Sequence, residues 1–199
     1  MKKLSTLFTV LLIILTISCT KKEDEVIPVV PIDPVIGDLY QGGIVAYILQ
    51  SGDQGYDANV KHGIIVAASD QNSGTAIWGC SNSSTGITGA DGTAIGTGAQ
   101  NTLDILNSCT EANSAAAICS TLTLNDYSDW FLPSKDELNI LYTNRVAIAN
   151  SGGAFDNVGQ VYWSSSESGY KAWIQSLITG QQLSDVKGAN YNVRAIRNF

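Results

Sequence analysis

The hydrophobic and polar residues along this chain change their pattern several times. An uncharged, largely apolar run covers residues 4–17, and a charged patch follows at 20–25. After residue 38, short runs rich in β-branched and aromatic residues alternate with Gly and polar turns, which is typical of strands. The predicted strands are 44–49, 63–68, 75–78, 161–165, 171–178, 182–186 and 191–196.

The middle of the chain carries the helical signals. Residues 102–109 place Leu and Ile at near-helical spacing, and 115–122 continue with small residues. Ser134 is followed three residues later by Glu137, which is the pattern of a capping box at a helix start. The predicted fold class is therefore α+β, with mixed antiparallel sheets and two or three short helices in the middle of the chain. Between strands and helices, residues 79–98 are polar and Gly-rich and predict a long irregular loop.

The first residues have the layout of a secretory signal peptide. Lys2 and Lys3 precede the apolar run, which is too short for a membrane-spanning helix of about 20 residues. The segment 15–19 resembles a lipobox and ends at Cys19, so we expect Cys19 to carry the lipid. An ordinary signal peptide cut elsewhere is the alternative. The charged patch after Cys19 is similar to the export signal of some surface lipoproteins, which predicts a lipid-anchored, surface-exposed protein of the bacterial outer membrane.

A Pro-rich segment separates the predicted lipid from the folded part. Pro28, Pro31 and Pro34 are spaced by three residues, which matches the turn of a polyproline II helix and predicts a semi-rigid stalk. The predicted organisation is a signal peptide at 1–18, a lipidated Cys with its stalk at 19–37, and one domain at 38–199. A domain of that length is large enough for a single core.

The charge of the chain excludes one class of partner. The sequence has 11 basic and 18 acidic residues, and its net charge of −7 becomes more negative when Lys2 and Lys3 are removed with the signal peptide. An acidic protein repels phosphate backbones, so nucleic acid is not an expected partner. We expect contact with the membrane through the lipid anchor.

Three cysteines remain beyond Cys19, so at most one intramolecular disulfide can form in an oxidising compartment. Two short helices joined by a turn predict a Cys109–Cys119 disulfide. The same interpretation leaves Cys80 as a buried free thiol.

Three ordered motifs carry a resemblance to a known family. They are Asp-Trp-Phe-Leu-Pro-Ser-Lys-Asp-Glu-Leu at 129–138, Tyr-Trp-Ser-Ser-Ser-Glu at 162–167 and Val-Arg-Ala-Ile-Arg at 193–197. Together they resemble the Lcl C-terminal domain family, a bacterial domain of unknown function, over most of residues 38–199. The resemblance implies a C-type-lectin-like fold. It also implies an extracellular protein, often a lipoprotein, with an adhesive or ligand-binding role.

Groups for catalysis are few. His62 is the only histidine, and no nucleophile-elbow pattern accompanies it, so we expect no enzyme activity. No cofactor is expected apart from Ca²⁺, for which Asp126 and Asp129 form an oxygen-rich cluster of weak candidates. The alternative is that these residues only make the turn into Trp130.

Aromatic and polar residues are interleaved near the end of the chain, a composition that suits sugar rings or protein epitopes. We predict ligand contacts at Tyr170, Lys171, Asn190 and Tyr191. The tryptophans at 130, 163 and 173 lie in apolar strands and are predicted to be core residues. Two C-terminal arginines, at 194 and 197, are predicted to pair with carboxylates such as those at 167 or 185.

The sequence therefore supports three functional hypotheses. The leading one is a surface-anchored lipoprotein whose domain binds an extracellular glycan or protein without catalysis. The second is a structural or assembly lipoprotein of the cell envelope. An extracellular hydrolase is the third and has the least support.

Overall fold

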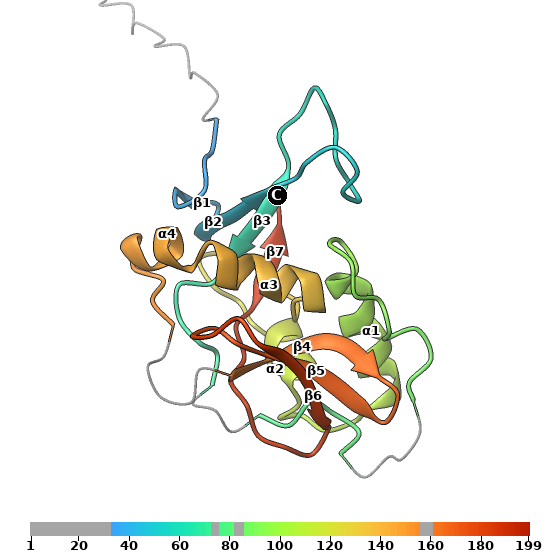
Figure 1. Ribbon diagram of the computed structural model, residues 1–199. Helices are drawn as coiled ribbons and strands as arrows, with labels where there is room; N and C mark the ends of the chain where they lie inside the picture. Colours follow the sequence, from blue (N-terminus) through green and yellow to red (C-terminus); the bar gives the residue numbers. More distant parts are fainter. Residues whose placement is uncertain (1–32, 73–75, 82–85, 156–160) are drawn as a thin grey trace, which may run out of the picture. The chain divides into compact units, whose positions relative to one another are not determined.

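Two antiparallel sheets and four helices are found in the part of the chain that the structure, a computed structural model, describes (Figure 1). The described residues are 33–72, 76–81, 86–155 and 161–199. The predicted signal peptide, Cys19 and the first part of the stalk lie outside them. The α+β class is confirmed, while the C-type-lectin-like assignment stays a prediction. Among the described residues, no helix is long and apolar enough to cross a membrane.

The first sheet has the strand order β1-β2-β3-β7. Its strands are β1 (Leu39–Tyr40), β2 (Gly43–Ile48), β3 (Gly63–Val66) and β7 (Ile196–Asn198), and all neighbours are antiparallel. β3 is buried on both faces. Because side chains alternate along a strand, Ile65 enters one hydrophobic cluster while its neighbours at 64 and 66 enter the other.

The second sheet has the order β4-β5-β6, so β6 is an edge strand. Its strands are β4 (Val161–Ser168), β5 (Lys171–Ser176) and β6 (Gln182–Val186). The bounds predicted for β6 are correct. The strand predicted at 191–196 is wrong except for its last residue, because 191 and 192 form only isolated bridges and β7 covers Ile196–Asn198.

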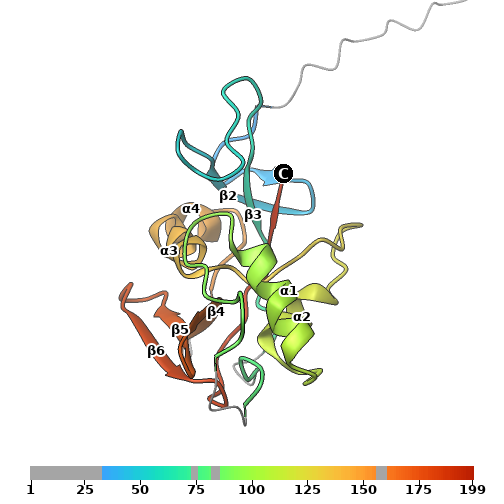
Figure 2. The same cartoon turned by 90° about the vertical axis from the view of Figure 1, so that its right-hand side faces the viewer.

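The helices separate and cover the sheets (Figure 2). They are α1 (Gly98–Ser108), α2 (Ala115–Ser120), α3 (Lys135–Thr143) and α4 (Arg145–Asn150). α1 and α2 pack against β4, whereas α3 contacts strands of both sheets. The sequence predicted the first three helices and missed α4, which has no side-chain cap at its start.

The predicted capping box at the start of α3 is confirmed. The Ser134 hydroxyl accepts the Glu137 N–H at 3.3 Å, and the Glu137 carboxylate accepts the Ser134 N–H at 2.7 Å. That carboxylate is fully buried and also accepts the Gly96 N–H at 2.8 Å. Burial raises the pKa of Glu137, although these hydrogen bonds act in the opposite direction. Glu137 thus joins the Gly-rich segment to α3.

The rest of that segment, residues 86–97, is attached through its backbone. The Glu167 carboxylate accepts the Ile87 N–H at 2.7 Å, and the Ala90 carbonyl accepts the Glu167 N–H at the same distance. The Ser166 hydroxyl donates to the Gly92 carbonyl at 2.6 Å. β4 therefore holds an irregular segment in one conformation without any strand pairing.

The predicted disulfide is wrong. Cys80 and Cys109 form the bond, with Cα atoms 4.9 Å apart, and Cys119 is the buried free thiol. α2 places Cys119 fully inside the hydrophobic cluster that also contains Cys109, and Cys80 packs against this cluster from the loop after residue 78 and takes Cys109 as its partner. The sequence interpretation exchanged the roles of Cys80 and Cys119.

Candidate functional site

Trp173 lies at the surface, contrary to the prediction that it is a core residue. It is only partly buried, whereas Trp130 and Trp163 are buried as predicted. In the antiparallel register, Trp173 faces Ser184 on the edge strand, and its neighbours Ala172 and Ile174 point to the opposite, buried face. An indole on the open face of a sheet offers a flat apolar surface to solvent.

Polar side chains surround this indole. The Lys135 ammonium lies 4.2 Å from the centre of the Trp173 ring. The Gln182 amide donates to the Lys135 carbonyl at 2.9 Å and to the Gln175 side-chain oxygen at 3.2 Å. Gln175 in turn donates to the side chain of Asn139 on α3 at 2.8 Å. This network fixes the side chains around the indole before any ligand arrives.

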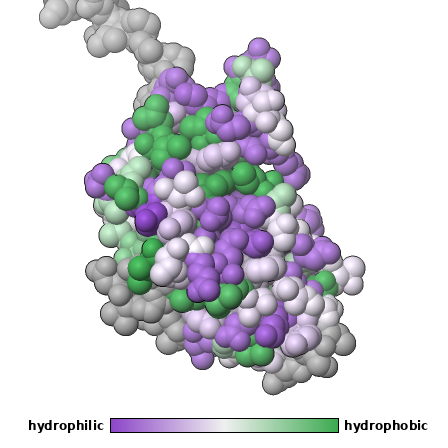
Figure 3. All heavy atoms as spheres, viewed as in Figure 1, coloured by the Kyte–Doolittle hydropathy of each residue, from purple (hydrophilic) through white to green (hydrophobic). Residues whose placement is uncertain are grey.

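We call this surface the Trp173 face, which consists of Lys135, Asn139, Lys171, Trp173, Gln182 and Ser184. Over β5 and β6 the surface is mostly hydrophilic, with small hydrophobic areas (Figure 3). The combination of one partly exposed aromatic ring with amide, hydroxyl and ammonium groups suits a polar ligand that has one apolar side.

Two of the predicted ligand contacts lie at the turn between β4 and β5. Tyr170 is 60% exposed, and the Lys171 ammonium is 5.9 Å from its ring centre. Lys171 also shares its side of β5 with Trp173, two residues away. The turn therefore extends the Trp173 face toward the end of the sheet.

The other two predicted contacts are consecutive residues that differ in exposure. Asn190 is exposed, but Tyr191 is partly buried and its ring packs edge-on against Trp163 with centroids 4.9 Å apart. The Tyr191 hydroxyl donates to the Asp185 carboxylate at 2.6 Å. Burial and this bond raise the pKa of Tyr191 to about 12. Tyr191 thus fixes β6 from the buried side of the sheet, opposite to the Trp173 face.

Asp185 interacts with two of the predicted residues. Its pKa is lowered by the Tyr191 hydrogen bond first, then by its backbone bond to Val186, and also by the positive charge of Lys171. Asp185, which the sequence analysis did not include among the site residues, therefore bonds to Tyr191 and makes no ion pair with Lys171 among the described contacts.

The two calcium candidates differ in their surroundings. The Asp129 carboxylate forms a bidentate ion pair with Arg197 at 2.6 and 2.9 Å, which lowers the pKa of Asp129. Asp126 is exposed and lies in a turn, where its own φ is positive at 68°. Among the described residues, the one group with metal-ligand spacing contains the two disulfide cysteines and Glu111, and it includes neither aspartate.

The arginine pairings also differ from those predicted. Arg194 pairs with Asp70 at 2.5 Å, and Arg197 pairs with Asp129 as described above. Glu167 instead forms a buried ion pair with Lys187. The carboxylates at 70 and 129 lie more than 60 residues before their arginines, so spacing along the chain gave no signal for these pairs.

Comparison with known proteins places the chain in a family. The model of the Lcl C-terminal domain matches residues 68–197, which is more than half of the chain. The chain belongs to this family. No curated protein matches the sequence. A fimbrial protein from Bacteroides ovatus aligns with 77% of this chain at 16% identity and a TM-score of 0.45, and the chain spans 43% of that protein's length.

The three sequence motifs by which this chain resembles the Lcl C-terminal domain family contact one another inside the fold. The Phe131 N–H donates to the Ile196 carbonyl at 2.8 Å, and the Ile196 N–H donates to the Phe131 carbonyl at 3.0 Å, which joins the first motif to the third. The Ser165 N–H donates to the Pro133 carbonyl at 2.7 Å, which joins the second motif to the first. These contacts hold the sheets together, so the motifs mark the fold of the Lcl C-terminal domain.

One signal in the sequence did point to the Trp173 face. In Lys171–Ser176, small or apolar residues at 172 and 174 alternate with Lys, Trp and Gln at 171, 173 and 175. This period of two assigns Trp173 to the polar side of a half-buried strand. Lys135 reaches Trp173 only because α3 packs on β5, so no pattern in the sequence predicts this contact.

Proposed function

We propose that this protein is a surface-anchored lipoprotein of the outer membrane whose C-type-lectin-like domain binds an extracellular ligand without catalysis. Membership of the Lcl C-terminal domain family supports a surface or adhesion role. The lipobox-like segment ending at Cys19 and the Pro-rich stalk support the anchor.

The observation that carries the proposal is the Trp173 face. A tryptophan that could be buried at the centre of a sheet is instead partly exposed, next to Lys135 at 4.2 Å and a fixed network of amide groups. Sugar rings have an apolar side and a polar edge, so this surface fits a carbohydrate better than an extended apolar partner. We infer that the ligand is a glycan, and a protein epitope is the alternative outcome of the test.

The groups that could support a hydrolase have structural partners. The Nδ1 atom of His62 lies 3.1 Å from the Phe199 carbonyl, and Glu137 is fully buried among backbone N–H donors. Burial raises the pKa of the Cys119 thiol, which opposes formation of a nucleophilic thiolate. These contacts favour a binding role over a catalytic one.

Glycan-array binding of the purified protein tests the proposal. Trp173→Ala should weaken binding of any glycan that is found by tenfold or more, because an exposed aromatic residue dominates contact energy at such surfaces. Tyr191→Phe, which removes a hydroxyl on the buried side, is the matched control and should leave affinity unchanged. If a folded Trp173→Ala variant binds with unchanged affinity, the ligand does not bind at the Trp173 face.

A structural or assembly role in the envelope is the second candidate. β6 is an edge strand on which Leu183 and Val186 are each 51% exposed. An exposed edge with apolar side chains can pair with another strand. If the protein binds no glycan and sediments as an oligomer that Leu183→Lys dissociates, the structural role is the better explanation.

A further inference from the structure

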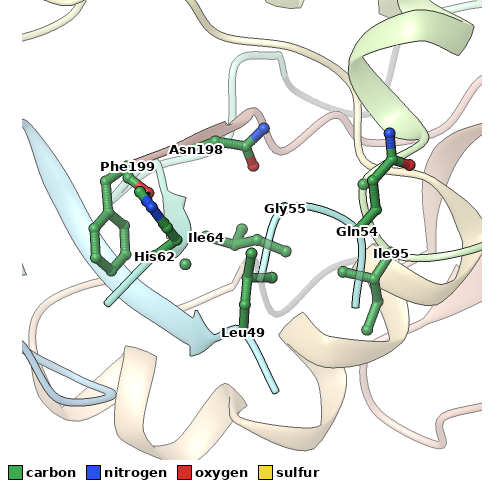
Figure 4. Close-up of a pocket in the computed structure, with 10 residues that line it drawn as sticks. Leu49, Gln54, Gly55, His62, Ile64, Ile95, Asn198 and Phe199 are labelled. Atoms are coloured by element: carbon green, nitrogen blue, oxygen red, sulfur yellow. Dashed lines mark hydrogen bonds between the residues drawn. The ribbon is translucent and has the colours of Figure 1, made fainter. Parts of the chain in front are cut away.

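A cavity of about 270 Å³ lies beside the first sheet, between the loop after β2, the start of β3, the segment before α1 and the end of β7 (Figure 4). The side chains that line it include Leu49, Gln54, His62, Ile64, Ile95 and Asn198, of which Gln54 and Asn198 are exposed.

Three polar side chains reach this cavity with unused hydrogen-bonding capacity. Within the described part of the chain, no protein group bonds to the side-chain amides of Gln54 and Asn198. The His62 Nδ1 atom is 3.1 Å from the Phe199 carbonyl, which can only accept, so Nδ1 carries the proton. In the neutral ring, Nε2 is then left as an acceptor. The site thus offers two amides and one imidazole acceptor to a ligand.

The remaining side chains make the cavity apolar in its centre. Figure 4 shows Ile64 and Leu49 near the His62 ring, and Ile95 beside Gln54. None of the residues that line the cavity has an acidic side chain, a lysine or an arginine, but Phe199 is the last residue, and an oxygen of its terminal carboxylate lies 3.1 Å from His62 Nδ1. This carboxylate repels an anionic ligand, so the chemistry favours an uncharged one.

We propose that this cavity binds one neutral N-acetylhexosamine residue. An acetamido group supplies an N–H donor and a carbonyl acceptor for the two side-chain amides, and its methyl group fits the aliphatic centre. Ligand pockets usually measure about 300 to 1,000 Å³, so a cavity near the lower limit admits one sugar ring and not a longer chain. The site is separate from the Trp173 face, and its test does not depend on the ligand of that face.

NMR titration of the isotope-labelled protein with N-acetyl-D-glucosamine tests the proposal. A ligand of this size is expected to bind with a Kd of about 1 mM and to shift the side-chain amide signals of Gln54 and Asn198. Asn198→Ala and Gln54→Ala should each weaken the affinity by about fivefold, the effect of one lost hydrogen bond of ~1 kcal/mol. Asn107→Ala, at an exposed asparagine of α1, is the matched control and should bind like the wild type.

Two results would overturn the proposal. One is equal binding of D-glucose, which lacks the acetamido group. The other is the absence of any shift of the Gln54 and Asn198 amides at about 20 mM sugar, which is well above the expected Kd. Thermal melts of the alanine variants establish that they are folded, so a loss of affinity can be assigned to the cavity. Shifts confined to signals around Trp173, with none at Gln54 and Asn198, would place the sugar on the Trp173 face and also overturn the proposal.

Discussion

The Lys187 ammonium and the Glu167 carboxylate pair inside the protein, where their side chains are only 1% and 5% exposed. The ammonium lies 5.0 Å from the ring centre of Trp78, and the carboxylate accepts the Ile87 N–H. If one partner of a buried ion pair is removed, the remaining charge is neither paired nor solvated by water. The pair therefore holds the Glu167 carboxylate in position for the Ile87 N–H, which is one of several attachments of the Gly-rich segment.

Removing one partner of this pair should be strongly destabilising. Lys187→Met leaves the Glu167 charge buried and is expected to lower the free energy of unfolding by about 3 to 5 kcal/mol in urea titrations. The double variant with Glu167→Gln should recover part of that loss. Asp33→Asn, which breaks the exposed pair with Lys61, is the control and should cost less than about 1 kcal/mol. A Lys187→Met variant of normal stability would mean that the pair is not buried.

The disulfide between Cys80 and Cys109 can be mapped directly. Non-reducing peptide mapping should recover these two residues in one linked peptide, and Cys119→Ala should not change the map. Reduction should lower the free energy of unfolding by about 3 to 4 kcal/mol, because the bond closes a loop over a sequence separation of 29 residues. A peptide that links Cys109 to Cys119 would contradict the structure.

The ion pair between Asp129 and Arg197 predicts how stability depends on pH. The Arg197 hydrogen bond holds the pKa of Asp129 below its usual value. A carboxyl group of this kind stabilises the fold above its unfolded pKa of about 3.9 and loses that contribution as the pH falls through the folded value. Asp129→Asn should therefore be less stable than the wild type at neutral pH, and the difference should shrink below about pH 3.9.

Urea unfolding at several pH values measures this difference. Asp126→Asn makes the same chemical change at an exposed neighbour and serves as the control, with no comparable change of the difference with pH. A difference between wild type and Asp129→Asn that stays constant down to the acid limit would show that the ion pair does not form in solution.

Lipidation at Cys19 predicts where the protein is found. Cys19→Ala should move the protein from the membrane to the soluble fraction, and intact-mass analysis of the wild type should show attached acyl chains, since several chains on one Cys give stable anchoring. Cys119→Ala should stay in the membrane fraction. An unmodified Cys19 in the wild-type protein is the result that excludes the anchor.

Local signals predicted part of this fold. The capping box of Ser134 and Glu137 depends on four consecutive residues, and the strand at Gln182–Val186 depends on a short run between turns. Both patterns act over short stretches of chain, so they can be identified without the rest of the molecule. α4 has neither a side-chain cap nor a long apolar pattern, which explains why it was missed.

Features that depend on distant parts of the chain could not be predicted. The disulfide was assigned to the wrong pair because Cys80 reaches Cys109 only through the packing of its loop beside α1. The prediction that Trp173 is a core residue rests on the apolar character of its strand and does not account for the alternation along Lys171–Ser176. The cavity near Asn198 combines four separate parts of the chain, so no continuous stretch of sequence indicates it.

The attachment of the Gly-rich segment has a consequence for how this domain can vary in evolution. Its bonds to β4 and α3 use backbone groups of Ile87, Ala90, Gly92 and Gly96, whereas the side chains at 88, 91, 93 and 94 are exposed. Replacing an exposed side chain leaves every one of those backbone bonds intact. These four positions can therefore accept many amino acids, so that homologous proteins could present different surfaces on an unchanged scaffold.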